Sequence, residues 1–120
     1  MTAARNTGNA AVRVPMIHEA DAPAGESGRV YKYIQIERDA AIVRRKAGLD
    51  IVVCGDDTDS NRQLAKEIEE SAVGAGNYRR HEPHPLSAGP HALPHYQPNV
   101  RPPEGHSFYE TARRKARRKR

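Results

Sequence analysis

The chain has 120 residues, which is enough for one small domain. Its hydrophobic content of 37% is low for a globular protein, so we expect part of it to be disordered or weakly packed. The single cysteine, Cys54, excludes an intramolecular disulfide, and no apolar run approaches the roughly 18 residues of a membrane span. These features predict a soluble cytoplasmic protein, or a fragment of a larger one, with no membrane partner.

The formal charge of +5 is concentrated at the C-terminus. Residues 113–120 read RRKARRKR and leave the rest of the chain with 13 basic against 15 acidic residues. We expect residues 111–120 to form a basic tail that attracts RNA, DNA or an acidic protein surface, with residues 113–120 disordered or a frayed helix. A solubilising terminus without a dedicated partner is the alternative. The basic residues expected to contact nucleic acid here are Arg113, Arg114, Lys115, Arg117, Arg118, Lys119 and Arg120.

The first half of the chain predicts a leader, a strand and a helix. Residues 1–28 contain prolines, glycines and no sustained periodicity, which indicates an irregular leader. Residues 30–36 alternate imperfectly and predict a strand. Residues 37–47 have apolar positions at helical spacing, and Gly48 is placed to end that helix.

The middle of the chain carries the strongest pattern. Residues 49–54 are short, apolar and β-branched, which predicts a buried strand. Residues 60–72 place Leu64 and Ile68 on one stripe of a helix that should pack on this strand, so Leu64→Ala should cost about 2–5 kcal/mol. The N-terminus of this helix should be capped by Asp57, Thr58 or Asp59.

Two further strands are expected near the C-terminus. Residues 93–97 are bounded by prolines and should lie at a sheet edge, and residues 106–109 are rich in aromatic side chains. Residues 98–105 read as a loop joining them. The predicted fold is α+β, a small sheet with two helices, in which one domain (residues 29–110) lies between the irregular leader and the basic tail.

A histidine cluster is the main candidate for chemistry, because the unperturbed pKa of histidine lies near neutrality. Residues 81–109 contain five of the six histidines of the chain: His81, His84, His91, His95 and His106. One interpretation is a zinc site, since two pairs of them have HxxH and HxxxH spacing. Pro94 disfavours a helix that would carry the second pair, and no cysteine lies nearby.

The second interpretation is a metal-free acid/base site. Two histidines on neighbouring strands could act on a ribose 2′-hydroxyl and its phosphodiester, and His95 and His106 form the natural pair. Arg101, or Arg79 and Arg80, could neutralise the phosphate, while Tyr96 and Tyr109 could position a base or donate a hydrogen bond. The alternative is that these histidines and tyrosines only border a small sheet.

Two other features predict structure rather than chemistry. The acidic residues Asp56, Asp57 and Asp59 could bind a divalent cation, but helix capping explains them with fewer assumptions. Cys54 precedes these acids, which disfavour its thiolate, so we expect a buried and inert thiol.

Residues 93–98 (LPHYQP) and 105–109 (GHSFY) resemble the C-terminal end of toxin domains from bacterial polymorphic toxins of the Rhs/YD-repeat kind. In those domains a Pro-His-aromatic-His-Pro segment precedes Gly-His-Ile-Phe-Tyr, and the strand, acidic turn and helix of residues 51–70 are also similar. His95 and His106 carry over, whereas Gln97 stands where the family has its second histidine.

The resemblance implies a small α+β nuclease domain, delivered at the end of a large exported toxin or present in the cytoplasm. We therefore expect a metal-independent, ribonuclease-like domain without a cofactor, with RNA as its substrate and an immunity protein as a possible partner. A non-enzymatic module that binds nucleic acid or protein through the basic tail is the alternative.

Overall fold

The computed structural model describes residues 14–83 and 89–118, so His84 and the final Lys119 and Arg120 lie outside the described residues. Neither helix within these ranges is long and apolar enough to cross a membrane. The elements, in chain order, are β1 (Met16–Asp21), β2 (Tyr31–Ile36), α1 (Arg38–Lys46), β3 (Ile51–Cys54), α2 (Thr58–Val73), β4 (Tyr78–His81), β5 (His95–Pro98), β6 (Ser107–Tyr109) and β7 (Arg117–Arg118).

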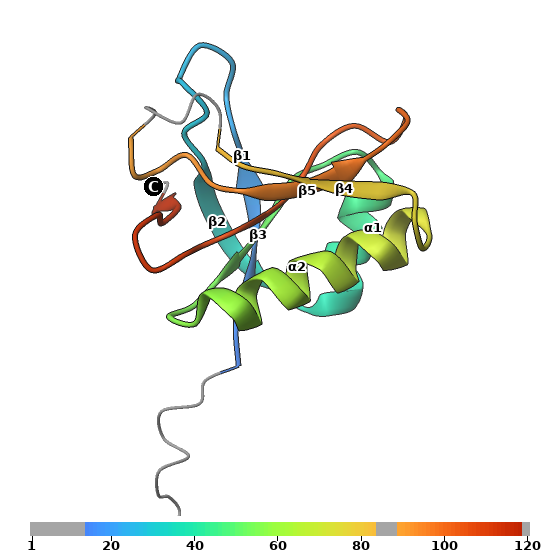
Figure 1. Ribbon diagram of the computed structural model, residues 1–120, viewed down its shortest axis with the longest axis horizontal. Coiled ribbons are helices and arrows are strands. Elements are labelled where there is room, and N and C mark those ends of the chain that lie inside the picture. The colour runs from blue at the N-terminus through green and yellow to red at the C-terminus, as the bar shows by residue number, and fades with distance from the viewer. Residues whose placement is uncertain (1–13, 84–88, 119–120) are drawn as a thin grey trace, which may run out of the picture.

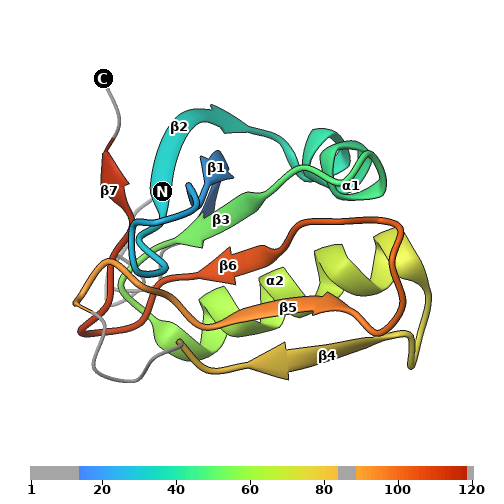
Figure 2. The same ribbon diagram turned by 90° about the horizontal axis from the view of Figure 1, so that it is seen from above.

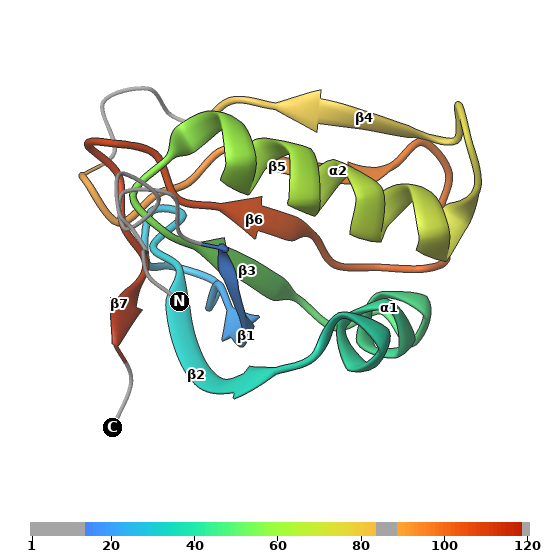
Figure 3. The same ribbon diagram turned by 90° about the horizontal axis from the view of Figure 1, so that it is seen from below.

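The described strands form one mixed sheet of order β4-β5-β6-β3-β1-β2-β7. β3 and β6 run parallel, as do β2 and β7, whereas the other neighbours are antiparallel. Both helices pack on one face, and α2 lies in front of β5, between β4 and β6, when the molecule is viewed from below (Figure 3). This arrangement confirms the predicted α+β class with a small sheet and two helices.

The main core lies between the helices and the sheet, and Figure 1 shows α2 below strands β4 and β5. Ile51 and Val53 of the central strand β3 point into it, and Ile68 of α2 is fully buried against them. Leu64 is partly buried against the same cluster, so the predicted packing of α2 on β3 is confirmed. Asp57 caps α2 by accepting a hydrogen bond from the backbone N–H of Ser60 at 3.1 Å.

A second, smaller core covers the opposite face of the sheet. Val52 and Phe108 point into it, and Leu93 and Ala116 cover them from the segments before β5 and before β7. The expected tail is therefore wrong for its described part. Ala116 is buried, and residues 117–118 pair with β2 as strand β7, because this face needs a cover that the helices do not supply.

Besides β7, two further strands were missed, β1 and β4. β1 lies inside the expected leader, where Ile17 and Ala20 are buried and the strand pairs with both β2 and β3 (Figure 2). β4 pairs with the outer side of β5, so β5 is an interior strand and its predicted edge position is wrong. Neither missed strand has a clear apolar alternation, so its pairing partners decide its conformation.

A buried ion pair fixes the segment that leads into β6. Arg45 of α1 and Glu69 of α2 are both fully buried, with Arg45 Nε 2.8 Å from Glu69 Oε1 and Nη2 3.1 Å from Oε2. Arg45 Nη1 also donates to the carbonyl oxygen of Glu104 at 2.9 Å, and the Ser107 hydroxyl donates to Glu69 at 2.7 Å. Because these bonds hold residues on both sides of His106, they fix its position at the start of β6.

Candidate active site

Three histidines form a row on the sheet face opposite the helices. His81 of β4 is paired with His95 of β5, and their rings stack with centroids 5.6 Å apart and an interplanar angle of 12°. The ring of His106, just before β6, meets His95 edge to face at 4.8 Å. Phe108 packs against His95 and His106 with ring centroids 5.1 and 5.0 Å away. The two histidines singled out from the sequence are therefore direct neighbours.

Asp50 holds His106 from the adjacent strand. Its Oδ1 accepts a hydrogen bond from the backbone N–H of His106 at 2.7 Å and lies 3.1 Å from the ring Nδ1. The parallel pairing of β3 with β6 brings these residues together, and the N–H of Ile51 donates to the carbonyl of His106 at 3.1 Å. An imidazole bound through Nδ1 turns Nε2 away from the carboxylate, and the carboxylate forms an ion pair with the ring when it is protonated.

His95 lies in a different environment from that of His106. Burial lowers the pKa of His95 to about 4, and the neighbouring His106 adds to this effect. Its Nδ1 lies 3.3 Å from the carbonyl of Leu93, and its Nε2 lies 3.2 Å from the side-chain oxygen of Gln97. At neutral pH His95 is therefore a neutral imidazole, whereas the ring Nδ1 of its neighbour His106 lies 3.1 Å from the Asp50 carboxylate.

His81 was part of the expected cluster, but its place beside His95 could not be inferred because β4 was not predicted. Within the described residues its Nε2 is buried and has no hydrogen-bond partner. Buried ring nitrogens are normally paired, so this atom marks an incomplete polar contact at the end of the row.

The arginines expected at the site separate by strand alternation. Arg79 is exposed and paired with Gln97, on the same face as the histidines. Arg80 lies on the helix face, where it contacts Glu82 at 2.6 Å and the hydroxyl of Tyr109 at 3.2 Å. Arg101 forms an exposed ion pair with Glu104 at 2.7 Å in the loop between β5 and β6.

The tyrosines lie away from the histidines. Tyr109 and Tyr96 are buried in the core between the sheet and α2, with ring centroids 5.9 Å apart. Because successive side chains of a strand point to opposite faces, Tyr109 lies on the helix face of the sheet, whereas Phe108 and His95 lie on the other face. The structure therefore places both tyrosines outside the site expected for them.

The basic residues near the C-terminus have different environments. Arg114 donates to the carbonyl oxygens of Gly89 and Ala92, both at 3.0 Å, and Lys115 donates to that of Gly55 at 3.0 Å. The side chains of Arg114 and Lys115 therefore hold this segment against the rest of the domain. The side chains that stay exposed to solvent in the described part of this segment are Arg113, Arg117 and Arg118.

The remaining candidates from the sequence, a metal site and the Cys54 thiol, are not supported as reactive sites by their geometry. No set of three His, Cys, Asp or Glu side chains within residues 14–83 and 89–118 is arranged to hold a metal ion. Cys54 is buried, and burial together with the nearby Glu110 raises the pKa of its thiol to about 12. A thiol in this state is a poor nucleophile at neutral pH.

No family model matches the chain, and no curated protein or solved structure was found to match it.

Proposed function

We propose that this protein is a metal-independent, ribonuclease-like domain that cleaves RNA with His95 and His106. The observation that carries the proposal is the contact between their rings, with centroids 4.8 Å apart, in which His95 is kept neutral by burial and His106 contacts the Asp50 carboxylate. Paired groups whose surroundings favour different protonation states are the usual basis for assigning an acid and a base.

His95 is the general base in this mechanism. Its lowered pKa of about 4 keeps the ring neutral at physiological pH, so it can accept the proton of a ribose 2′-hydroxyl. The resulting 2′-oxygen attacks the adjacent phosphorus and forms a 2′,3′-cyclic phosphate. RNA must displace the Gln97 side chain from His95 Nε2 for this contact, since Gln97 lies 3.2 Å from that nitrogen.

His106 is the general acid. Its Nε2 gives a proton to the 5′-oxygen as the bond between phosphorus and that oxygen breaks, and Asp50 stabilises the imidazolium before the transfer. Asp50 also fixes the direction of the ring, because the same oxygen contacts the backbone and the side chain of His106. We therefore assign Asp50 as a positioning residue.

Arg79 is the best placed arginine to contact the scissile phosphate or its neighbour. It is exposed on the histidine face, whereas Arg80 is directed to the other face. The exposed Arg117 and Arg118 of β7 would add sequence-independent attraction for the RNA backbone. The motif resemblance supports the same role, that of a toxin domain with an immunity protein as its partner.

The test is incubation of the purified full chain with single-stranded RNA, with a DNA strand of the same sequence as the control. The proposal expects RNA fragments ending in a 2′,3′-cyclic phosphate, no cleavage of DNA, and no effect of a chelator. RNA binding without cleavage would instead favour the non-enzymatic module, which needs only the basic C-terminal segment.

A further inference from the structure

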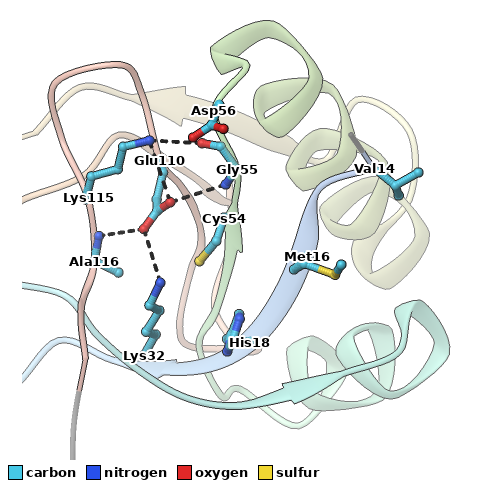
Figure 4. A pocket seen from close by; sticks show the side chains of 10 residues that line it. All are labelled: Val14, Met16, His18, Lys32, Cys54, Gly55, Asp56, Glu110, Lys115 and Ala116. Atoms are coloured by element: carbon cyan, nitrogen blue, oxygen red, sulfur yellow. Dashed lines mark hydrogen bonds and ion pairs between the residues drawn. The ribbon is translucent and has the colours of Figure 1, made fainter. Parts of the chain in front are cut away.

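A cavity lies on the same sheet face as the histidine row, at the other end of the parallel strands β3 and β6 (Figure 4). Its volume is about 460 Å³, within the range of small-molecule sites. Glu110 follows His106 by four residues, so the two sites are separated by roughly 13 Å along the strand. The lining residues are Val14, Met16, His18, Lys32, Cys54, Gly55, Asp56, Glu110, Lys115 and Ala116.

A buried carboxylate organises the polar side of this cavity. Glu110 is only 4% exposed, and its two oxygens accept hydrogen bonds from the backbone N–H groups of Gly55 at 3.2 Å and Ala116 at 3.0 Å. The ammonium groups of Lys32 and Lys115 lie farther away, at 3.8 and 4.0 Å from this carboxylate. These distances exceed a hydrogen bond, so the attraction of both lysines to Glu110 is one of charge.

The ammonium groups of Lys32 and Lys115 therefore have N–H groups that can donate hydrogen bonds to a ligand. The Lys115 ammonium donates one N–H to the carbonyl of Gly55, and the ammonium group of Lys32 donates no hydrogen bond to any of the described residues. The buried carboxylate of Glu110 lies between the two ammonium groups of Lys32 and Lys115. The second carboxylate of the lining, that of Asp56, is exposed, so solvent and salt screen its charge. The buried part of the cavity is thus suited to an anion.

The rest of the lining is apolar. Met16, Cys54 and Ala116 supply its hydrophobic surface, and Cys54 stays a neutral thiol. His18 adds one polar atom, since its Nδ1 is bound to the carbonyl of Tyr33 at 2.8 Å and its Nε2 is left for a ligand. An apolar surface beside two cationic donors matches a flat heterocycle joined to an anionic group.

We propose that this cavity binds a nucleotide phosphate, with the phosphate oxygens at Lys32 and Lys115 and the base against Met16 and Cys54. The phosphate belongs to a free nucleoside monophosphate or to the 5′-end of an RNA strand. The site does not depend on RNA cleavage, because none of its residues belongs to the histidine row.

The experiment is a nuclear magnetic resonance titration of the ¹⁵N-labelled full chain at low ionic strength. Adenosine monophosphate should shift the backbone amides of Gly55, Lys115 and Ala116 and leave those of His95 and His106 unchanged. Adenosine should bind far more weakly, and inorganic phosphate should shift the same amides at higher concentration. A dinucleotide with a 5′-phosphate that binds as tightly as the monophosphate assigns the site to a strand end, and weaker binding assigns it to the free nucleotide.

Matched variants separate a built site from general charge attraction. Lys32→Met and Lys115→Met should each weaken the monophosphate about tenfold or more, the usual worth of a charge-assisted hydrogen bond. Lys66→Met removes the same charge from an exposed position on α2 and should leave affinity unchanged. If a cavity variant fails to fold, the wild-type shift map decides. Shifts absent from the cavity, or an equal loss in Lys66→Met, would overturn the proposal.

Discussion

One oxygen of Asp50 accepts the backbone N–H of His106 at 2.7 Å and faces the ring Nδ1 of the same residue at 3.1 Å. The main chain and the side chain of His106 are thus fixed by the single carboxylate of Asp50, which directly precedes β3. The proposed acid/base role of His106 depends on this contact.

Replacing Asp50 with asparagine tests that dependence. Asp50→Asn keeps an oxygen that can accept the backbone N–H but removes the negative charge that stabilises the imidazolium. The value of kcat for RNA cleavage should fall about 10–100-fold with little change in KM, and the alkaline limb of the pH profile should move to lower pH. If Asp50 had only a structural role, Asp50→Asn would lower thermal stability instead. The pH profile of the remaining cleavage activity would then keep its shape.

The neighbouring arginines Arg79 and Arg80 form a matched pair on opposite faces of β4. Arg79→Ala should weaken RNA binding and cleavage about tenfold or more, because a phosphate contact is lost on the histidine face. Arg80→Ala should leave RNA binding nearly unchanged. It should lower the stability of the fold slightly, because the hydrogen bond from Arg80 to the hydroxyl of Tyr109 is lost. Binding assays at two salt concentrations check both variants, and equal losses would assign the effect to net charge.

The pKa of His95 predicts how stability depends on pH. Its value of about 4 in the fold lies below the ordinary 6.5, so the unfolded chain takes up this proton first as the pH falls. Stability should be complete above about pH 6.5 and should decline toward pH 4, by on the order of 1–3 kcal/mol from this residue.

Denaturant titrations of the wild type and of His95→Gln measure this contribution. The rings of His81 and His106 lie against His95, so the difference between the two proteins, rather than either curve, isolates the contribution of His95. The variant should lose less stability between pH 7 and pH 4.5. Parallel curves would show that His95 gains its proton as readily in the fold as in the unfolded chain.

The C-terminal segment should matter for stability as well as for RNA binding. Deleting residues 111–120 removes the buried Ala116 and the hydrogen bond from the Arg117 N–H to the carbonyl of Val30 at 2.8 Å. The deletion should lower the melting temperature by several degrees. The double variant Arg117→Gln, Arg118→Gln should keep that temperature and reduce the salt dependence of RNA binding. An unchanged melting temperature in the deletion would contradict the folded tail.

The sequence allowed the central part of this fold to be predicted because its local patterns agree with its packing. Residues 51–54 are β-branched and buried, and Asp57 caps the next helix as its position indicated. The contact between His95 and His106 followed from placing them on adjacent strands. Asp50 could not be found in this way, since it lies 56 residues from His106 and meets it only through the parallel pairing.

The missed elements share a physical cause. Tyr78–His81 is rich in arginine and becomes a strand only by pairing with β5, which then carries His81 to His95. The charge run near the C-terminus indicated a solvated tail. The buried carboxylate of Glu110, the backbone contacts of Lys115 and the uncovered face of the sheet hold that segment in place instead. Pairing and long-range capping of this kind leave no periodic signal in the sequence.

The most direct test of the proposed function is RNA cleavage by the wild type, His95→Ala and His106→Ala, each with and without a chelator. The account predicts a loss of about 10²–10⁴-fold in either variant, a bell-shaped pH profile for the wild type, and no effect of the chelator. Wild-type cleavage that survives both substitutions, or that stops when divalent metal is removed, would contradict it.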